Sequence, residues 1–263
     1  MSALAASSTH AQVGLLAGRA VRHIIRQPAQ VVFPIAFPLV LLAVNSSGLD
    51  AATNLPGFPT TSYLDFALAV PFMQGALFAA LNGGQDLARD IEGGFLDRLA
   101  LTPMSGAALI LGQLGGALFM GVVSALIYLI VGLLIGTGIA AGVGGALVLL
   151  VLAVTISFAF ACLGTFVALR AGSGQAVQGF FPLFFVLLFL SSAFFPRNLI
   201  EQDWFREVAT YNPVSYLVEG IRSLVITGWD AQALAQAFGI AALMIAAFMA
   251  LSAWALRTRL VRT

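Results

Sequence analysis

Long stretches without charge dominate the hydrophobic pattern of this chain. Residues 27–49, 66–85, 99–169, 171–196 and 231–256 contain no Asp, Glu, Lys or Arg. A helix needs about 20 apolar residues to cross a hydrocarbon core about 30 Å thick. The third stretch is long enough for two such helices, and five glycines within residues 136–145 indicate a turn that divides it. The pattern predicts an all-α polytopic membrane protein with six transmembrane helices, at residues 29–48, 64–84, 107–135, 146–169, 175–195 and 231–256.

Composition agrees with this pattern and excludes one kind of chemistry. The chain is 60% hydrophobic and 9% charged, with a mean hydropathy of +0.99, whereas soluble domains carry about 25% charged residues. All 12 basic residues are arginine. A phosphate-binding loop of the G-x-x-x-x-G-K-[ST] kind requires a lysine, so this chain holds no such ATP site. We expect no cofactor within the chain itself.

The arginines predict how the helices are oriented. Six crossings place both termini on the same side of the membrane, and nine of the 12 arginines would lie on that side. Only Arg197, Arg206 and Arg222 would lie on the other side. The positive-inside rule therefore predicts a multi-pass protein of the cell membrane with both termini in the cytoplasm. The first residues lack a basic region followed by an apolar segment, so we expect no cleavable signal peptide.

An amphipathic helix is predicted at residues 13–26, before the first transmembrane helix. Arg19, Arg22 and Arg26 share one face. The opposite face carries only apolar residues, namely Val13, Leu16, Ala17, Ala20, Val21 and Ile24. This arrangement favours a helix that lies in the inner membrane interface. A cytoplasmic helix that packs on another subunit is the alternative.

A charged segment at residues 85–103 separates the second and third predicted transmembrane helices. It carries both charge signs, and its apolar positions recur at helical spacing at Leu87, Ile91, Phe95, Leu96 and Leu99. A solvated loop is one interpretation. A short cytoplasmic helix would instead expose an apolar patch that no lipid covers, and such patches usually mark docking surfaces.

A mixed segment at residues 196–230 lies on the opposite side of the membrane. Its second half, after Pro213, is apolar enough to re-enter the bilayer but contains Glu219 and Arg222. Their i, i+3 spacing on a helix would allow an ion pair that lowers the cost of burying both charges. We therefore predict a re-entrant outer hairpin between the fifth and sixth transmembrane helices.

Polar and aromatic side chains within the predicted spans are candidates for a substrate path. Gln74 and Asn82 fall on one arc of the second transmembrane helix, and Phe181 and Phe185 belong to a phenylalanine-rich fifth helix. Polar groups in lipid should face protein or a pathway. Hydrogen bonding between helices and ordinary aromatic packing are the simpler interpretations.

The layout, together with two motifs, resembles the membrane subunit of type-2 ABC exporters, in particular the branch of drug-resistance permeases. The first motif runs from Glu92-Gly93-Gly94-Phe95 through Asp97-Arg98-Leu99 to Leu101-Thr102-Pro103, and the second combines Phe195-Pro196 with Asn212-Pro213, Tyr216, Glu219 and Arg222. The resemblance implies coupling to an ATPase through Asp90, Glu92, Gly94, Phe95, Leu96, Arg98, Leu99 and Pro103. It also implies an outer gate formed by Asn212, Pro213, Tyr216, Glu219 and Arg222.

The same resemblance implies partners and a transport activity. Two permease subunits, either identical or different, would work with two separate ATP-binding cassette subunits that hold ATP and magnesium. The complex would export a hydrophobic or amphipathic substrate, such as a drug, a natural product or a lipid-like molecule. No nucleic-acid partner is expected at a net charge of +1.

Other functional classes find less support in the sequence. An ion-coupled secondary transporter is the main alternative, but it needs ionisable groups inside the membrane, which the spans almost entirely lack. A serine–histidine hydrolase is excluded because His10 and His23 both precede the first span. The single cysteine, Cys162, and the absence of H-E-x-x-H predict no metal site.

Overall fold

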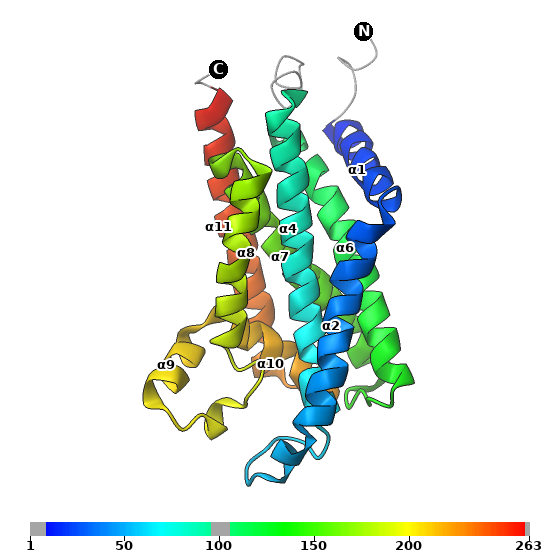
Figure 1. Cartoon of the computed structure of the whole chain (residues 1–263), viewed down its shortest axis with the longest axis vertical. Helices are drawn as coiled ribbons and strands as arrows, with labels where there is room; N and C mark the ends of the chain where they lie inside the picture. Colours follow the sequence, from blue (N-terminus) through cyan, green and yellow to red (C-terminus); the bar gives the residue numbers. More distant parts are fainter. Residues whose placement is uncertain (1–8, 96–105, 261–263) are drawn as a thin grey trace.

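The computed structural model describes residues 9–95 and 106–260, and over these residues it contains helices and no strands (Figure 1). The long helices are α1 (Thr9–Ile25), α2 (Pro28–Gly48), α4 (Ala69–Glu92), α6 (Gly106–Leu134), α7 (Gly142–Ala171), α8 (Gly174–Phe189) and α11 (Ala231–Leu260). The shorter elements are η1 (Asp50–Asn54), α3 (Tyr63–Ala67), η2 (Arg197–Leu199), α9 (Asp203–Tyr211) and α10 (Pro213–Ile226). The prediction of an all-helical membrane protein is confirmed.

Five segments are long and apolar enough to cross a membrane. They coincide with the predicted spans one, two, three, four and six, as Val31–Gly48, Tyr63–Glu92, Ala108–Leu134, Gly142–Ala171 and Ala231–Arg259. The predicted fifth span at residues 175–195 is shorter, because α8 ends at Phe189 after 16 residues. Such a helix is about 24 Å long, less than the thickness of a hydrocarbon core.

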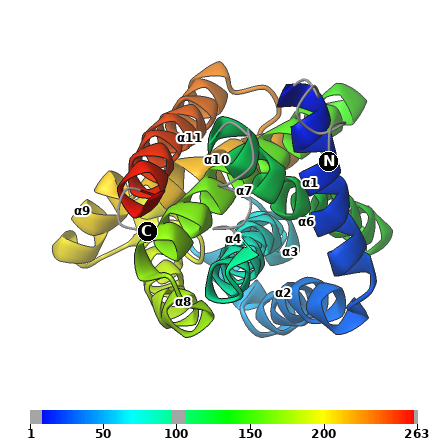
Figure 2. The same ribbon diagram turned by 90° about the horizontal axis from the view of Figure 1, so that it is seen from above.

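The long helices run roughly parallel, and α1, the end of α4 and the end of α11 lie at the same end of the bundle (Figure 1). We call this the proximal end and the opposite end, which carries α9 and α10, the distal end. Seen from above, α4 lies in the middle of the bundle (Figure 2). It packs against α2, α6, α7 and α8. The contact with α7 is close, because a Cβ atom at Gly164 would collide with the backbone of Ala80.

Helix α1 packs along α6 through three glycines. Cβ atoms at Gly112, Gly115 and Gly116 would collide with or crowd α1. The residues of α1 at these contacts belong to the predicted apolar face and are Leu16, Ala17, Ala20 and Ile24. The apolar face therefore meets α6 of the same chain, where Leu16 and Ile24 are buried and Ala17 and Ala20 are partly buried.

Helix α4 is longer than predicted. We expected a transmembrane helix at residues 64–84 followed by a separate segment at 85–103, but α4 continues without a break to Glu92. The three carboxylates in its last two turns, Asp86, Asp90 and Glu92, have partners on other helices, which removes the reason for the helix to end in front of them. It ends at Gly93 and Gly94, and Gly94 adopts φ +64°, a conformation that favours glycine.

A tyrosine on α6 compensates for the two prolines inside α2. Pro38 has no N–H, so it cannot donate the helical hydrogen bond to the carbonyl of Pro34. The buried Tyr128 hydroxyl donates to this same carbonyl oxygen at 2.8 Å. Prolines are tolerated in transmembrane helices where a neighbouring group satisfies the freed backbone atom. This hydrogen bond also fixes α2 against α6.

We predict that Tyr128→Phe lowers the stability of the purified protein by about 1–2 kcal/mol, because it leaves a buried carbonyl without a donor. Thermal unfolding in detergent measures the effect. Pro38→Ala restores the N–H of residue 38, so Tyr128→Phe should cost much less in the Pro38→Ala background. An equal cost in both backgrounds would show that the tyrosine does not act through this carbonyl.

Candidate functional site

Side chains of α1, α4 and α6 meet in an ionic cluster at the proximal end. Both guanidinium nitrogens of Arg19 donate to Asp90, at 2.9 and 2.7 Å. The Gln113 amide donates to the same carboxylate at 2.8 Å. Hydrogen bonding to Asp90 raises the pKa of Arg19 above its ordinary value. Asp90, predicted as a coupling residue, therefore joins three helices.

The segment that follows α4 begins against this cluster. The Arg19 guanidinium lies 4.0 Å from the centre of the Phe95 ring, within range of a cation–π interaction. Glu92 accepts a hydrogen bond from the backbone N–H of Gly174, the first residue of α8, at 3.1 Å. Phe95 and Glu92, near the end of the described part of the predicted coupling segment, thus contact α1 and the first residue of α8. Four predicted coupling residues lie outside the described ranges, namely Leu96, Arg98, Leu99 and Pro103.

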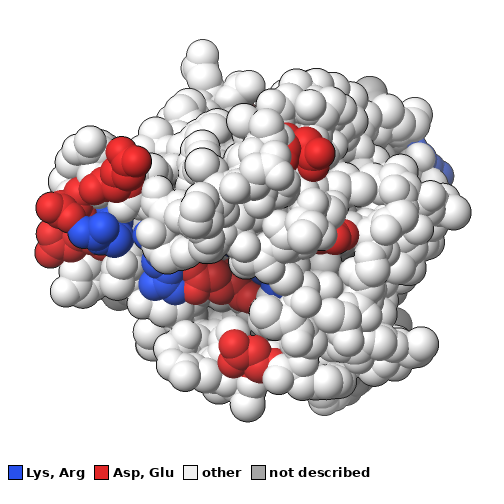
Figure 3. Space-filling model, turned by 90° about the horizontal axis from the view of Figure 1, so that it is seen from below, with Lys and Arg blue, Asp and Glu red and all other residues white. Residues whose placement is uncertain are grey.

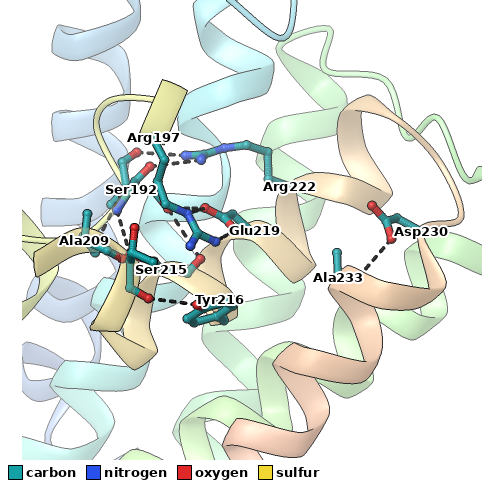
Figure 4. A network of polar contacts seen from close by, with 12 residues as sticks. Ser192, Arg197, Ala209, Ser215, Tyr216, Glu219, Arg222, Asp230 and Ala233 are labelled. Carbon is teal, nitrogen blue, oxygen red and sulfur yellow. Dashed lines mark hydrogen bonds and ion pairs between the residues drawn. The ribbon is translucent and has the colours of Figure 1, made fainter. Parts of the chain in front are cut away.

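A non-helical turn follows α8 at the distal end, and Arg222 of α10 binds it (Figure 4). The buried guanidinium donates to the backbone carbonyls of Ser192 at 3.0 Å, Ala193 at 2.9 Å and Phe66 at 3.2 Å. It also lies 3.6 Å from the centre of the Phe66 ring. A backbone turn buried in protein needs donors for its carbonyls, and this arginine supplies two of them while its third hydrogen bond binds the turn to α3.

Glu219 pairs with Arg197 and not with Arg222, contrary to the expectation from the i, i+3 spacing (Figure 4). Arg197 Nε donates to Glu219 at 2.7 Å, a second guanidinium nitrogen bonds the other carboxylate oxygen, and the Ser192 hydroxyl donates at 2.7 Å. The carboxylate raises the pKa of Arg197. The prediction was wrong because Arg222 is occupied by backbone carbonyls.

The remaining predicted gate residues connect α8, α9 and α10. Asn212 caps α10, since its side-chain oxygen accepts from Val214 N–H at 2.9 Å, and its amide donates to the Leu187 carbonyl at 2.6 Å. Pro213 is the first residue of α10, where its missing N–H costs nothing. The Tyr216 hydroxyl donates to the Thr210 carbonyl at 2.8 Å. The centre of the Tyr216 ring lies 4.6 Å from the Arg197 guanidinium carbon. All five predicted gate residues belong to one region.

Sequence reasoning missed Ser192 and Arg197 as members of this region. Arg197 follows the Phe195-Pro196 pair and is one of the three arginines expected on the outer side, which is the signal that could have identified it. Ser192 offers no comparable signal, because a serine at the end of an apolar run is common.

The two polar residues proposed for a substrate path do not come together. Gln74 is fully buried, and neither its amide nitrogen nor its amide oxygen has a hydrogen-bond partner among the described residues. Asn82 instead lines a small cavity shared with Ala20 of α1 and Met120 of α6. The hydrogen bond between helices that seemed the simplest role for Gln74 is therefore not formed.

Phe181 and Phe185 belong to a continuous column of rings. Phe78 of α4 contacts two rings of α2 and also the Phe181 ring, with centroids 5.3 Å apart. Phe181 and Phe185 are 5.0 Å apart, and the column continues through Phe189 to Phe194. The rings extend along α8 towards the turn that Arg222 binds.

We predict that Arg222→Lys destabilises the protein by about 2–4 kcal/mol, because a lysine ammonium cannot bridge three carbonyls and leaves buried acceptors unpaired. Arg206→Lys is the matched control, since Arg206 is half-exposed and pairs with Asp203 on its own helix. Size-exclusion profiles after heating measure both variants. Equal profiles would mean that the carbonyl contacts of Arg222 contribute no more than a surface ion pair.

Comparison with known proteins identifies the family. The profile of the ABC-2 type transporter family matches residues 11–226. The daunorubicin resistance ABC transporter permease protein DrrB1 of Streptomyces coeruleorubidus is 28% identical over 203 residues, which cover 75% of this chain and 69% of that protein. The probable doxorubicin resistance ABC transporter permease protein DrrC of Mycobacterium tuberculosis (strain CDC 1551 / Oshkosh) is 26% identical over 226 residues, which cover 84% and 78%. The chain therefore belongs to the ABC-2 type transporter family and is a membrane permease subunit of an ABC exporter.

Proposed function

We propose that this permease exports a hydrophobic or amphipathic compound, such as a drug, a natural product or a lipid-like molecule, from the cytoplasm or the inner leaflet. The family implies an ATP-binding partner subunit. We place ATP and magnesium on two separate ATPase subunits and infer that two permease subunits, identical or different, form the path. Two relatives are named for daunorubicin or doxorubicin resistance, which supports drug export.

We propose that the chain crosses the cell membrane six times, with α8 and the following turn forming the fifth crossing and residues 196–230 a re-entrant outer segment. The proximal end would face the cytoplasm. Charge supports this orientation, because the distal elements carry seven carboxylates against three arginines, while the seven other arginines within the described residues lie towards the proximal end. The Arg222-bound turn supports the re-entrant segment, since non-helical backbone inside a membrane must be buried in protein or line a cavity.

The observation that carries the coupling proposal is the pair of contacts at the end of α4. Arg19–Asp90 joins α4 to α1, and Glu92–Gly174 joins the end of α4 to the start of α8. A force applied by an ATPase to the segment after Glu92 therefore reaches three helices at once. Rigid-body movement of these helices would open the path, without covalent chemistry in this chain.

We predict that Phe95→Asp combined with Leu99→Asp, or Glu92→Gln alone, lowers ATP-driven transport at least tenfold while the permease still inserts. The first variant adds charge to the expected apolar docking patch, and the second removes the negative charge of the acceptor for Gly174 N–H, which weakens this hydrogen bond. Co-purification with the co-expressed ATPase and uptake into inverted vesicles measure the two effects. Glu201→Gln, a distal surface change, is the control.

Normal co-purification together with normal transport in these variants would show that the coupling assignment is wrong. Transport driven by an ion gradient in vesicles without an ATPase would instead support the alternative, an ion-coupled secondary transporter.

We infer that the aromatic column and Gln74 line the path once the helices move apart. Leaving an amide buried without a partner costs about 1–3 kcal/mol, so a state in which Gln74 meets water or substrate is favoured by that amount. The column supplies apolar ring surface along α8 towards the distal gate region. The gate itself would be the set formed by Asn212, Pro213, Tyr216, Glu219 and Arg222.

We predict that Glu219→Ala reduces export several-fold while assembly with the ATPase persists, because it removes the carboxylate by which α10 holds Ser192 and Arg197 in the segment after α8. Thiol labelling of the Gln74→Cys variant measures the opening of the path independently. The Cys162→Ser change removes the native thiol, so that only position 74 is labelled. ATP turnover should raise labelling at position 74, and Glu219→Ala should change that response. Unchanged export and unchanged labelling would restrict Glu219 to a structural ion pair.

A further inference from the structure

A groove lies at the distal end between the last turn of α8 and α9, and it borders the gate region at Asn212 and Pro213. It has a volume of about 560 Å³ and is open to the surroundings. Leu187 and Leu190 form one wall. The other wall belongs to α9 and consists of Trp204, Glu207, Val208 and Tyr211. The groove is large enough for a drug-sized molecule.

The apolar wall of α9 is unusually exposed. Trp204, Val208 and Tyr211 are spaced i, i+4 and i+7, so they share one face of the helix. Their exposed fractions are 61%, 39% and 79%. The two aromatic residues present flat apolar surface to whatever enters the groove. Ala209, on another face of α9, is fully buried.

One carboxylate, Glu207, lies in this otherwise apolar wall without a cationic partner. Over the described residues, the ion pairs at the distal end are Arg197 with Glu219 and Arg206 with Asp203, while Arg222 binds carbonyls. No distal arginine therefore neutralises Glu207. Acidic side chains gather at the edge of the distal face in the space-filling view (Figure 3).

This charge pattern decides among the possible occupants. Glu207 and its acidic neighbours Glu201 and Asp203 repel an anionic phospholipid. A second copy of this chain that docked through the same distal face would bring the same excess of carboxylates, and the three distal arginines are already engaged. A neutral acyl chain would cover the two aromatic rings but leave the carboxylate unpaired. A molecule with an apolar body and a positive charge would cover the aromatic rings and also pair with the carboxylate of Glu207.

We propose that this groove binds an amphipathic organic cation, with its apolar body against Trp204 and Tyr211 and its ammonium group beside Glu207. The aromatic faces also attract the cation directly. If the proposed export function is correct, the groove adjoins the gate at Asn212 and Pro213 and holds the substrate on release. Binding itself requires neither the ATPase nor turnover.

The test measures binding to the full chain in phosphatidylcholine nanodiscs. Trp229→Phe and Trp254→Phe leave Trp204 as the only tryptophan, whose fluorescence reports on the groove. Rhodamine 6G serves as an aromatic cation and fluorescein as an aromatic anion. We expect saturable quenching by rhodamine 6G and weak quenching by fluorescein. Glu207→Gln should raise the Kd for rhodamine 6G about threefold to fivefold, and Tyr211→Ala should raise it further.

Glu201→Gln is the matched control, because Glu201 is an exposed carboxylate of the same segment that does not line the groove. Equal effects of Glu207→Gln and Glu201→Gln, or equal quenching by the two dyes, would overturn the proposal. Efficient disulfide formation between two copies of the Tyr211→Cys variant would also overturn it, in favour of an interface between copies. Dye binding as expected, but without ATP-driven transport by the complex, would refute the export function and leave the binding site standing.

Discussion

The distal half of this protein depends on one arginine that replaces helical hydrogen bonds. Where α8 ends, the chain turns without helical structure, and its carbonyls need donors that water supplies poorly inside a protein. Arg222 provides three N–H donors from the next buried helix and binds carbonyls of the turn and of α3. The positions of α10, the turn after α8 and α3 therefore depend on one another. Burying a charge is costly, which explains why the guanidinium has so many acceptors around it.

The same solution recurs elsewhere in the bundle with other side chains. Tyr128 donates to the carbonyl that Pro38 leaves free, and Asn212 donates to the carbonyl of Leu187 at the end of α8. In each case a side chain of a different element satisfies backbone that its own helix cannot. Contacts of this kind join helices at defined points while the apolar surfaces between those points remain free to slide. A transporter needs this combination, because its helices must keep their partners and still change their relative positions.

The sequence predicts most helices well because their signal is local. A charge-free stretch of sufficient length defines a span, and four spans were predicted within a few residues of those observed, while the second extends eight residues further, to Glu92. The failures concern partners that are distant in sequence. Asp86 and Asp90 appeared to end a span, yet α4 continues because α1 supplies Arg19 and His23 near them. Glu219 appeared to pair with Arg222, its neighbour on the helix, but Arg197 is its partner. A G-x-x-x-G pattern such as Gly112 and Gly116 favours close helix packing, but it does not reveal that α1 is the helix that these glycines accommodate.

The attachment of α8 has a mechanical consequence. Its first N–H is bound by Glu92, and a carbonyl in its last turn is bound by Asn212, so both ends are held by other elements. A rod fixed at both ends responds to a push by bowing rather than by sliding. Pro182 lies in the middle of α8 and removes one internal hydrogen bond there, which is where a helix bends most easily. Displacement of the end of α4 would thus appear as curvature at the centre of α8, beside the phenylalanine rings that its two halves carry.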